Sequence, residues 1–173
     1  MLPACALLAA VALARLSARR VVAVLAVLAA LEWSAQVAMR GPAGHGFGTR
    51  EVAEVIAARY RPGDGVAYAL PEPSVTWVGR DLVAYYVPAD RRPRDVFLAS
   101  PQRVGGHYYA RECANLSACL GDPPRLWVVR YGLLADPLLG IGTAKEALLR
   151  GRYAPQLVEH RRNLTVALLV RRA

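Results

Sequence analysis

Two apolar runs fill most of the first forty residues, and a short basic segment separates them. The second run, residues 21–39, carries one charged side chain, Glu32, near its far end. A helix of this length rises roughly 28 Å, which matches the ~30 Å hydrocarbon core of a bilayer. The pattern therefore predicts a transmembrane helix over residues 21–39.

The basic segment, residues 15–20, contains Arg15, Arg19 and Arg20. Arginines that flank a membrane span stay on the cytoplasmic side and so set its direction of insertion. The chain from residue 40 onward is then expected outside the membrane. These features predict a protein of the cell membrane whose carboxyl-terminal domain is extracytoplasmic.

The first apolar run, residues 2–14, is too short to cross a bilayer, which takes about 17 to 25 residues. One interpretation is a partial helix, left from a preceding transmembrane helix of a longer membrane protein. Another is a secretion signal with residues 21–31 as its apolar part and cleavage near Ala35 or Ala38. Against the signal, its amino-terminal region is itself apolar and no clean A-x-A site comes after it. We expect a membrane segment over residues 1–39, and both interpretations export residues 40–173.

Beyond a glycine-rich linker at residues 40–48, helical and extended patterns alternate through a domain at residues 49–173. The predicted helices cover residues 47–61, 74–86 and 143–150, and the predicted strands cover residues 65–70, 95–99, 125–130, 153–160 and 164–171. Helices between strands favour parallel pairing, whereas the last two strands are expected to form an antiparallel hairpin. The expected fold class is α/β, a Rossmann-like and mainly parallel sheet with an antiparallel edge, preceded by one complete and one partial transmembrane helix.

Polar side chains mark where the helices are expected to begin. Thr49 and Ser74 are the predicted N-caps of the first two helices of the domain, because their hydroxyl groups can accept a backbone N–H bond. Thr143 and Glu146 have the spacing of a capping box, which predicts the start of the last helix at Thr143.

The chain is strongly basic, with 22 Lys and Arg residues against 13 Asp and Glu residues and a formal net charge of +9. Lys145 is its only lysine. A basic domain beside a membrane is attracted to anionic headgroups, by roughly 1 kcal/mol for each Lys or Arg near the surface. The sequence contains no helix-turn-helix, zinc-finger or RNP pattern, and the domain is expected to be exported. Membrane lipid is therefore the expected partner, and nucleic acid is not.

Two of the three cysteines, Cys113 and Cys119, frame a short polar stretch of the exported domain. In an oxidising compartment they can close a small disulfide loop, which in the chain-entropy model stabilises by only ~2–3 kcal/mol. The alternative is a pair of free thiols. A metal site is not expected, because the sequence has no C-x-x-C pair and no nearby pair of histidines.

Motifs for catalysis or cofactor binding are missing from the sequence. No G-x-G-x-x-G follows the first predicted strand, and neither G-x-x-x-x-G-K-[ST] nor G-x-S-x-G occurs. Gly140 and Gly142 either offer backbone N–H groups to a phosphate or simply form the turn into the last helix. We therefore assign no catalytic residue, no cofactor and no metal ligand.

One stretch combines aromatic and basic side chains ahead of a predicted strand. Tyr85 and Tyr86 close a predicted helix, and Arg91, Arg92 and Arg94 follow in a turn. Ligands of α/β sheets bind beyond the carboxyl ends of strands, so these side chains are candidate contacts for a sugar phosphate or lipid headgroup. The alternative is that the tyrosines pack the helix and the arginines cap its carboxyl end.

Several short motifs are shared with one protein family. They are R-P-G-D-G at residues 61–65, the spaced residues Asp81, Tyr85, Tyr86 and Pro88, R-P-R-D-V at 92–96, the cysteine pair with L-G-D at 120–122, R-L-W-V-V at 125–129 and L-T-V-A-L-L-V at 164–170. They resemble the carboxyl-terminal extracytoplasmic domain of actinobacterial multi-spanning glycosyltransferases. Those proteins are mannosyltransferase-like, related to glycosyltransferase family 39 and of the GT-C type. The likeness covers about residues 20–173.

The resemblance implies transfer of a sugar from a polyprenyl-phosphate donor at the outer face of the membrane. The acidic catalytic residues of that family belong to an early extracytoplasmic loop with no counterpart in this sequence, so no catalytic residue carries over. The chain is then expected to be a tail domain, inactive alone, that works with a membrane-embedded catalytic partner. The alternative function is a membrane-anchored extracytoplasmic binding or scaffold module with no link to a transferase.

Overall fold

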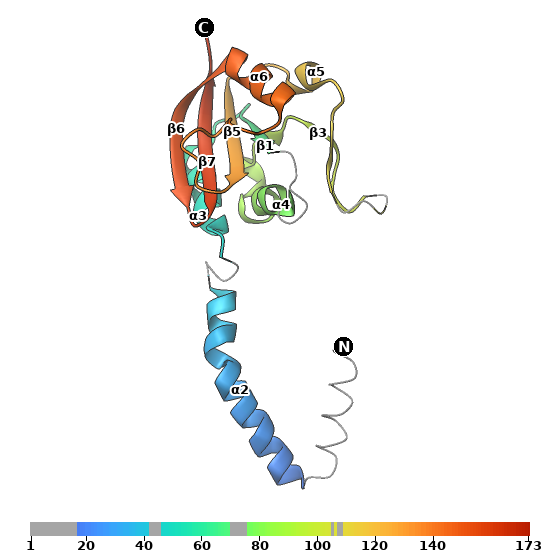
Figure 1. The fold of residues 1–173 in the computed structure, drawn as a ribbon, viewed down its shortest axis with the longest axis vertical. Helices are drawn as coiled ribbons and strands as arrows, with labels where there is room; N and C mark the ends of the chain where they lie inside the picture. Colours follow the sequence, from blue (N-terminus) through green and yellow to red (C-terminus); the bar gives the residue numbers. More distant parts are fainter. Residues whose placement is uncertain (1–16, 42–45, 70–75, 105, 107–108) are drawn as a thin grey trace. The chain divides into compact units, whose positions relative to one another are not determined.

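The computed structural model describes residues 17–41, 46–69, 76–104, 106 and 109–173 (Figure 1). The chain divides into two compact units, Met1–Gly44 and His45–Ala173. The partial helix expected at residues 2–14 and the cap expected at Ser74 lie outside the described residues.

The first unit contains the apolar helix α2, Ala18–Arg40. None of its residues is buried inside the protein, and by length and composition the helix could cross a membrane. It begins before the predicted residue 21, so Arg19 and Arg20 lie in its first turn. One apolar span is therefore confirmed, and the direction of its insertion stays a prediction.

A five-stranded mixed sheet forms the centre of the second unit, with the strand order β2-β1-β5-β7-β6. Its strands are β1 Gly65–Tyr68, β2 Arg94–Asp95, β5 Arg125–Tyr131, β6 Tyr153–Arg161 and β7 Leu164–Arg171. β1 pairs in parallel with β2 and β5, whereas β7 pairs antiparallel with β5 and β6. The α/β class and the final hairpin are confirmed, and the antiparallel part extends inward as far as the pairing of β5 with β7.

Helices pack on both faces of this sheet (Figure 1). They are α3 Thr49–Arg59, α4 Thr76–Tyr86, α5 Leu116–Leu120 and α6 Thr143–Arg152, with a short 3₁₀ turn, η1, at Ala89–Arg91. Side chains alternate along β5, so Trp127 and Val129 pack in the core with α3 and α4, while Leu126 and Val128 pack with α5 and α6. Burial on both faces explains why this strand is almost continuously apolar.

The prediction of one continuous strand over residues 95–99 is wrong, because the chain leaves one sheet and enters another within this range. β2 ends at Asp95, whose Oδ1 accepts the backbone N–H of Phe97 at 3.2 Å and turns the chain. Leu98–Ser100 then forms β3, which pairs with β4, Arg111–Glu112, in a separate two-stranded sheet. Neither β4 nor α5 was expected from the sequence pattern.

Two of the predicted helix caps are also wrong. Helix α3 has Gly48 at its N-cap, and helix α6 has Gly142 there, so Thr49 and Thr143 are already inside their helices. Glu146 turns back to accept the backbone N–H of Gly140 at 2.9 Å instead of that of Thr143. Glycine suits the Gly142 position because its φ is 115°, in the region that other residues rarely adopt.

A buried carboxylate joins α3, β1 and β5. Asp64 lies just before β1 and is 3% exposed. Its oxygens accept from Arg125 Nε at 2.9 Å, from Trp127 Nε1 at 2.9 Å and from the backbone N–H of Arg61 at 3.0 Å. The carboxylate therefore satisfies donors from a loop and from the central strand at once.

We expect Asp64→Ala to lower the free energy of unfolding by about 3–5 kcal/mol, since removing one partner of a buried ion pair leaves the other uncompensated. The measurement is urea unfolding of the full chain in micelles, followed by tryptophan fluorescence. Asp122→Ala is the matched control, because Asp122 is 73% exposed and lies 3.5 Å from Arg171. Its effect should stay within about 0.5 kcal/mol, and equal losses in the two variants would contradict the assigned role of Asp64.

Candidate functional site

The carboxyl end of β1 is the place where this topology would open a ligand crevice. The chain passes from β1 through α4 to β2 on one side of β1, and the next strand of the sheet, β5, lies on the other side. Open α/β sheets bind ligands where successive connections leave in opposite directions. We therefore take this end of β1 as the candidate site.

Four charged side chains from four elements meet at this place. Arg80 of α4 donates from Nε to Asp95 Oδ2 at 2.7 Å and from a terminal nitrogen to Glu112 Oε1 at 2.8 Å. The other oxygen of Glu112 lies 2.6 Å from Nζ of Lys145, in the first turn of α6. Glu112 thus bridges two cations that come from helices on opposite faces of the sheet.

The same two cations also contact β1 and an aromatic ring. Nζ of Lys145 donates to the backbone carbonyl of Tyr68 at 2.8 Å and lies 5.2 Å from the centroid of the Phe97 ring. The Arg80 guanidinium lies 4.8 Å from the centroid of the Tyr68 ring. The end of β1 is therefore covered by two charged side chains, and each of them contacts both a carboxylate and an aromatic ring.

Burial shifts the proton affinity of these groups in different directions. It lowers the pKa of Lys145, which is 2% exposed, and Glu112 offsets this only in part. Burial also lowers the pKa of Arg80, but Asp95 and Glu112 outweigh it, so the net pKa of Arg80 is raised. Burial, reinforced by Asp95, raises the pKa of the Tyr68 hydroxyl.

The network has two positive and two negative members, and each is paired with another. The network therefore leaves no free acid, base or nucleophile among its four side chains. A cavity of about 210 Å³ remains beside it, lined by Arg80, Arg92 and mostly apolar side chains such as Val83 and Leu98. Ligand pockets usually enclose 300–1,000 Å³, so this space would fit a small apolar group better than a nucleotide.

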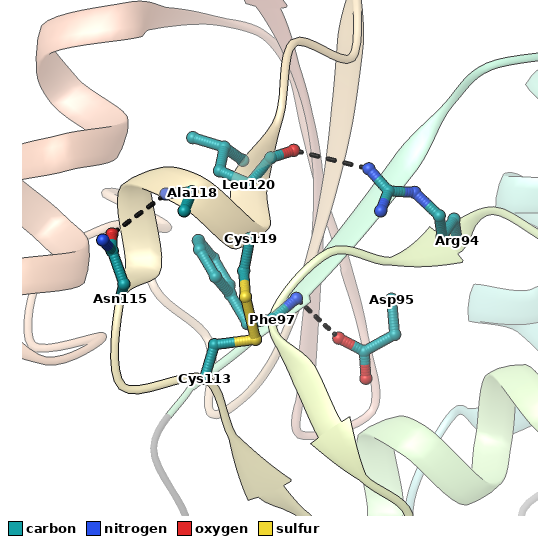
Figure 2. The surroundings of a disulfide bond; sticks show 8 residues. All are labelled: Arg94, Asp95, Phe97, Cys113, Asn115, Ala118, Cys119 and Leu120. Atoms are coloured by element: carbon teal, nitrogen blue, oxygen red, sulfur yellow. Dashed lines mark hydrogen bonds between the residues drawn. A yellow bond between two sulfur atoms is a disulfide. The ribbon is translucent and has the colours of Figure 1, made fainter.

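A disulfide begins at the residue that directly follows Glu112 in the sequence, and Figure 2 shows its surroundings. Cys113 and Cys119 are bonded, as the sequence predicted, and the backbone N–H of Cys113 donates to the carbonyl of Phe97 at 2.9 Å. The Asn115 side chain caps α5 by accepting the N–H of Ala118 at 3.0 Å. The cross-link therefore ties the residue next to Glu112 to α5.

The five candidate ligand contacts are not gathered into one site. Arg92 donates twice to the carbonyl of Val87, just beyond the end of α4, and Arg94 reaches the carbonyl of Leu120 at 3.5 Å. The remaining three are at the surface: Tyr85 is 81% exposed with its ring 4.9 Å from that of Tyr86, and Arg91 lies 3.8 Å from Asp90. Arg92 and Arg94 are thus engaged by backbone carbonyls, and Tyr85, Tyr86 and Arg91 are open to solvent.

No sequence pattern pointed to Arg80, Glu112 or Lys145, although one signal was available. Lys145 falls four residues before Leu149, which is fully buried, so the two side chains lie on the same face of α6. A charged side chain at such a position needs a buried partner. The spacing of residues along the sequence could not identify Glu112 as that partner, because its strand, β4, is only two residues long.

Neither a phosphate site nor a metal site emerges from the described geometry. The backbone N–H of Gly140 is bonded to Glu146, whose carboxylate occupies the start of α6. Among the residues that the structure describes, no group of three or more His, Cys, Asp or Glu side chains is placed to hold a metal ion.

No family model, curated protein or solved structure matches the chain.

We expect Glu112→Gln to lower the free energy of unfolding by about 3–5 kcal/mol, because it leaves two buried cations with one carboxylate. Adding Lys145→Met removes the unpaired ammonium and keeps the side-chain volume, so the double variant should be more stable than Glu112→Gln alone. Urea unfolding of the full chain in micelles measures both. A double variant less stable than the single one would contradict the pairing.

The pH dependence of the Glu112→Gln variant gives a second check. Lys145 in the folded chain has a pKa below its ordinary 10.5, so near that pH the unfolded chain binds more protons. Stability therefore rises with pH up to about 10.5. The rise should be absent when Lys145→Met is added.

Proposed function

We propose that this chain is a membrane-anchored, extracytoplasmic tail domain of a polyprenyl-phosphate-dependent glycosyltransferase of the mannosyltransferase-like, GT-C type. Its α/β sheet is Rossmann-like in its β1–α4–β2 part but has no nucleotide role. The domain helps to position the sugar donor or the acceptor, and a membrane-embedded partner or a further part of the same protein performs the transfer.

The observation that carries this proposal is the fully paired charge network at the end of β1. In a catalytic or cofactor-binding α/β domain this place holds the reacting groups, and here Arg80, Asp95, Glu112 and Lys145 neutralise one another. A positioning role needs a rigid domain and no free catalytic group. The resemblance of the sequence motifs to the glycosyltransferase family supplies the class of substrate, a polyprenyl-phosphate sugar donor.

Two further features support an extracytoplasmic location. Helix α2 is apolar and has Arg19 and Arg20 in its first turn, the flank that is retained on the cytoplasmic side. The bond between Cys113 and Cys119 belongs to an oxidising compartment. The second candidate function is an anchored binding or scaffold module without a transferase. The same paired charge network supports it, so the experiments must separate the two.

An extracytoplasmic location predicts that Cys113 and Cys119 are joined in a disulfide. In the full chain, residues 113 and 119 should resist a maleimide reagent until a reductant is added, whereas a form lacking residues 1–40 and kept in the cytoplasm should react at once. Losing the bond through Cys113→Ser should lower the free energy of unfolding by about 2–3 kcal/mol, the chain-entropy value for so short a loop. Reactive thiols in the full chain in membranes would contradict an extracytoplasmic domain.

The proposed link to a transferase predicts what the DNA upstream of the Met1 codon encodes. DNA directly upstream of the Met1 codon should encode, in frame, further apolar spans and an early extracytoplasmic loop rich in acidic residues. The chain produced alone should transfer no sugar from a polyprenyl-phosphate donor, and the longer product should. A stop codon with a ribosome site immediately before Met1 would favour the scaffold module.

A further inference from the structure

Exposed tyrosine, leucine and arginine side chains surround the point where the chain enters the second unit. We call this surface the entry face; it consists of Phe47, Arg50, Tyr85, Tyr86, Tyr131, Leu133 and Arg162. The described part of the unit begins at Gly46. The face is built from α3, α4, the end of β5 and the turn between β6 and β7, segments that are distant in the sequence.

One half of the entry face is held by the β6–β7 turn. The backbone N–H of Gly48 donates to the carbonyl of Arg162 at 3.1 Å, and the amide of Asn163 donates to the carbonyl of Gly46 at 3.1 Å. The ring of Phe47 meets that of Tyr131 edge-on, with centroids 5.6 Å apart. These bonds fix the start of the domain beside the end of β5.

The other half is an aromatic and cationic stack. The guanidinium of Arg50, one residue into α3, lies 5.5 Å from the centroid of the Tyr86 ring. The rings of Tyr86 and Tyr85 meet edge-on. Arg50 therefore connects the end of α4 to the start of the domain.

Large apolar and aromatic side chains on this surface are open to solvent to an unusual degree. Tyr85 is 81% exposed, Leu133 61% and Tyr131 50%. Inside the same domain, Leu, Val and Trp side chains of β5 and β7 are almost fully buried. Clustered exposure of this kind marks a surface that contacts something less polar than water.

The covalent link to α2 limits what can contact the entry face. Six residues, 41–46, separate the end of α2 at Arg40 from Phe47. Six residues span at most about 20 Å when fully extended. If α2 crosses the bilayer, the start of the domain cannot leave the vicinity of the headgroups.

The chemistry of the entry face suits a headgroup layer. Tyrosine is enriched at membrane–water interfaces, where its ring contacts the acyl boundary and its hydroxyl stays hydrated, and arginine binds phosphate. Two acidic side chains near it are engaged: Glu51 lies 3.9 Å from Arg162, and Glu159 pairs with Arg161 and Arg59. The entry face itself contains Arg50 and Arg162 and has no acidic member.

We infer that the entry face binds the headgroup region of an anionic bilayer and so fixes the orientation of the domain on the membrane. This inference rests on the anchoring in the proposed function but not on the transferase link. The orientation would hold the carboxyl end of β5 against the lipid surface.

The test is amide hydrogen exchange of the full chain in nanodiscs, made either of phosphatidylcholine alone or of an equal mixture with phosphatidylglycerol. In the mixture, exchange at residues 131–134 and 161–163 should slow roughly fivefold, the factor given by about one arginine's attraction to the surface. Residues 121–124 and 171–173, at the other end of the antiparallel strands, should not change.

Arg162→Gln and Arg171→Gln form a matched pair of variants. Both arginines are more than half exposed, and each lies near a single carboxylate, at 3.9 Å from Glu51 and 3.5 Å from Asp122. The lipid-dependent slowing should be lost in Arg162→Gln and kept in Arg171→Gln.

Three results would overturn the inference. They are equal exchange in the two lipids, slowing that is the same at both ends of the domain, and slowing that appears only after a second membrane protein is added, which would make the face a protein-docking surface. The thiol and upstream-sequence experiments do not involve this face, so their failure is distinguishable from failure here.

Discussion

Glu112 is the residue on which the arrangement of this domain depends most. Its single carboxylate lies between Arg80 and Lys145, and these cations belong to α4 and α6, which pack in different cores on opposite faces of the sheet. A buried ammonium or guanidinium without a counter-ion costs several kcal/mol. The ion pairs of Glu112 therefore add to the apolar packing of both helices, and they depend on a two-residue strand, β4, that carries this carboxylate. The disulfide at the next residue keeps β4 in place.

The position of this network has consequences for function. It lies at the end of β1, where open α/β sheets bind ligands, and its charges pair with one another. This pairing is the reason that we propose a positioning role for the domain, with the transfer performed by another part.

Much of the fold could be predicted from local patterns. The apolar run of α2, the doubly buried β5 and the hairpin of β6 and β7 each extend over seven or more residues, so periodicity or continuous apolarity identified them. Prediction failed where the chain turns within a few residues. At Asp95 a single side-chain bond to Phe97 ends one strand and starts another in a different sheet, and at Gly48 and Gly142 the backbone conformation, not a side-chain hydroxyl, decides where a helix begins.

The sequence by itself predicted the apolar span, the α/β class and a disulfide between Cys113 and Cys119 (with free thiols as the alternative), since these depend on composition, periodicity and close spacing along the chain. It also showed that Lys145 is the only lysine. Only the tertiary structure decided what that lysine binds. Its partners, Glu112 and the carbonyl of Tyr68, lie 33 and 77 residues away, and the choice of a buried ion's partner depends on which atoms the packed core brings within hydrogen-bond distance.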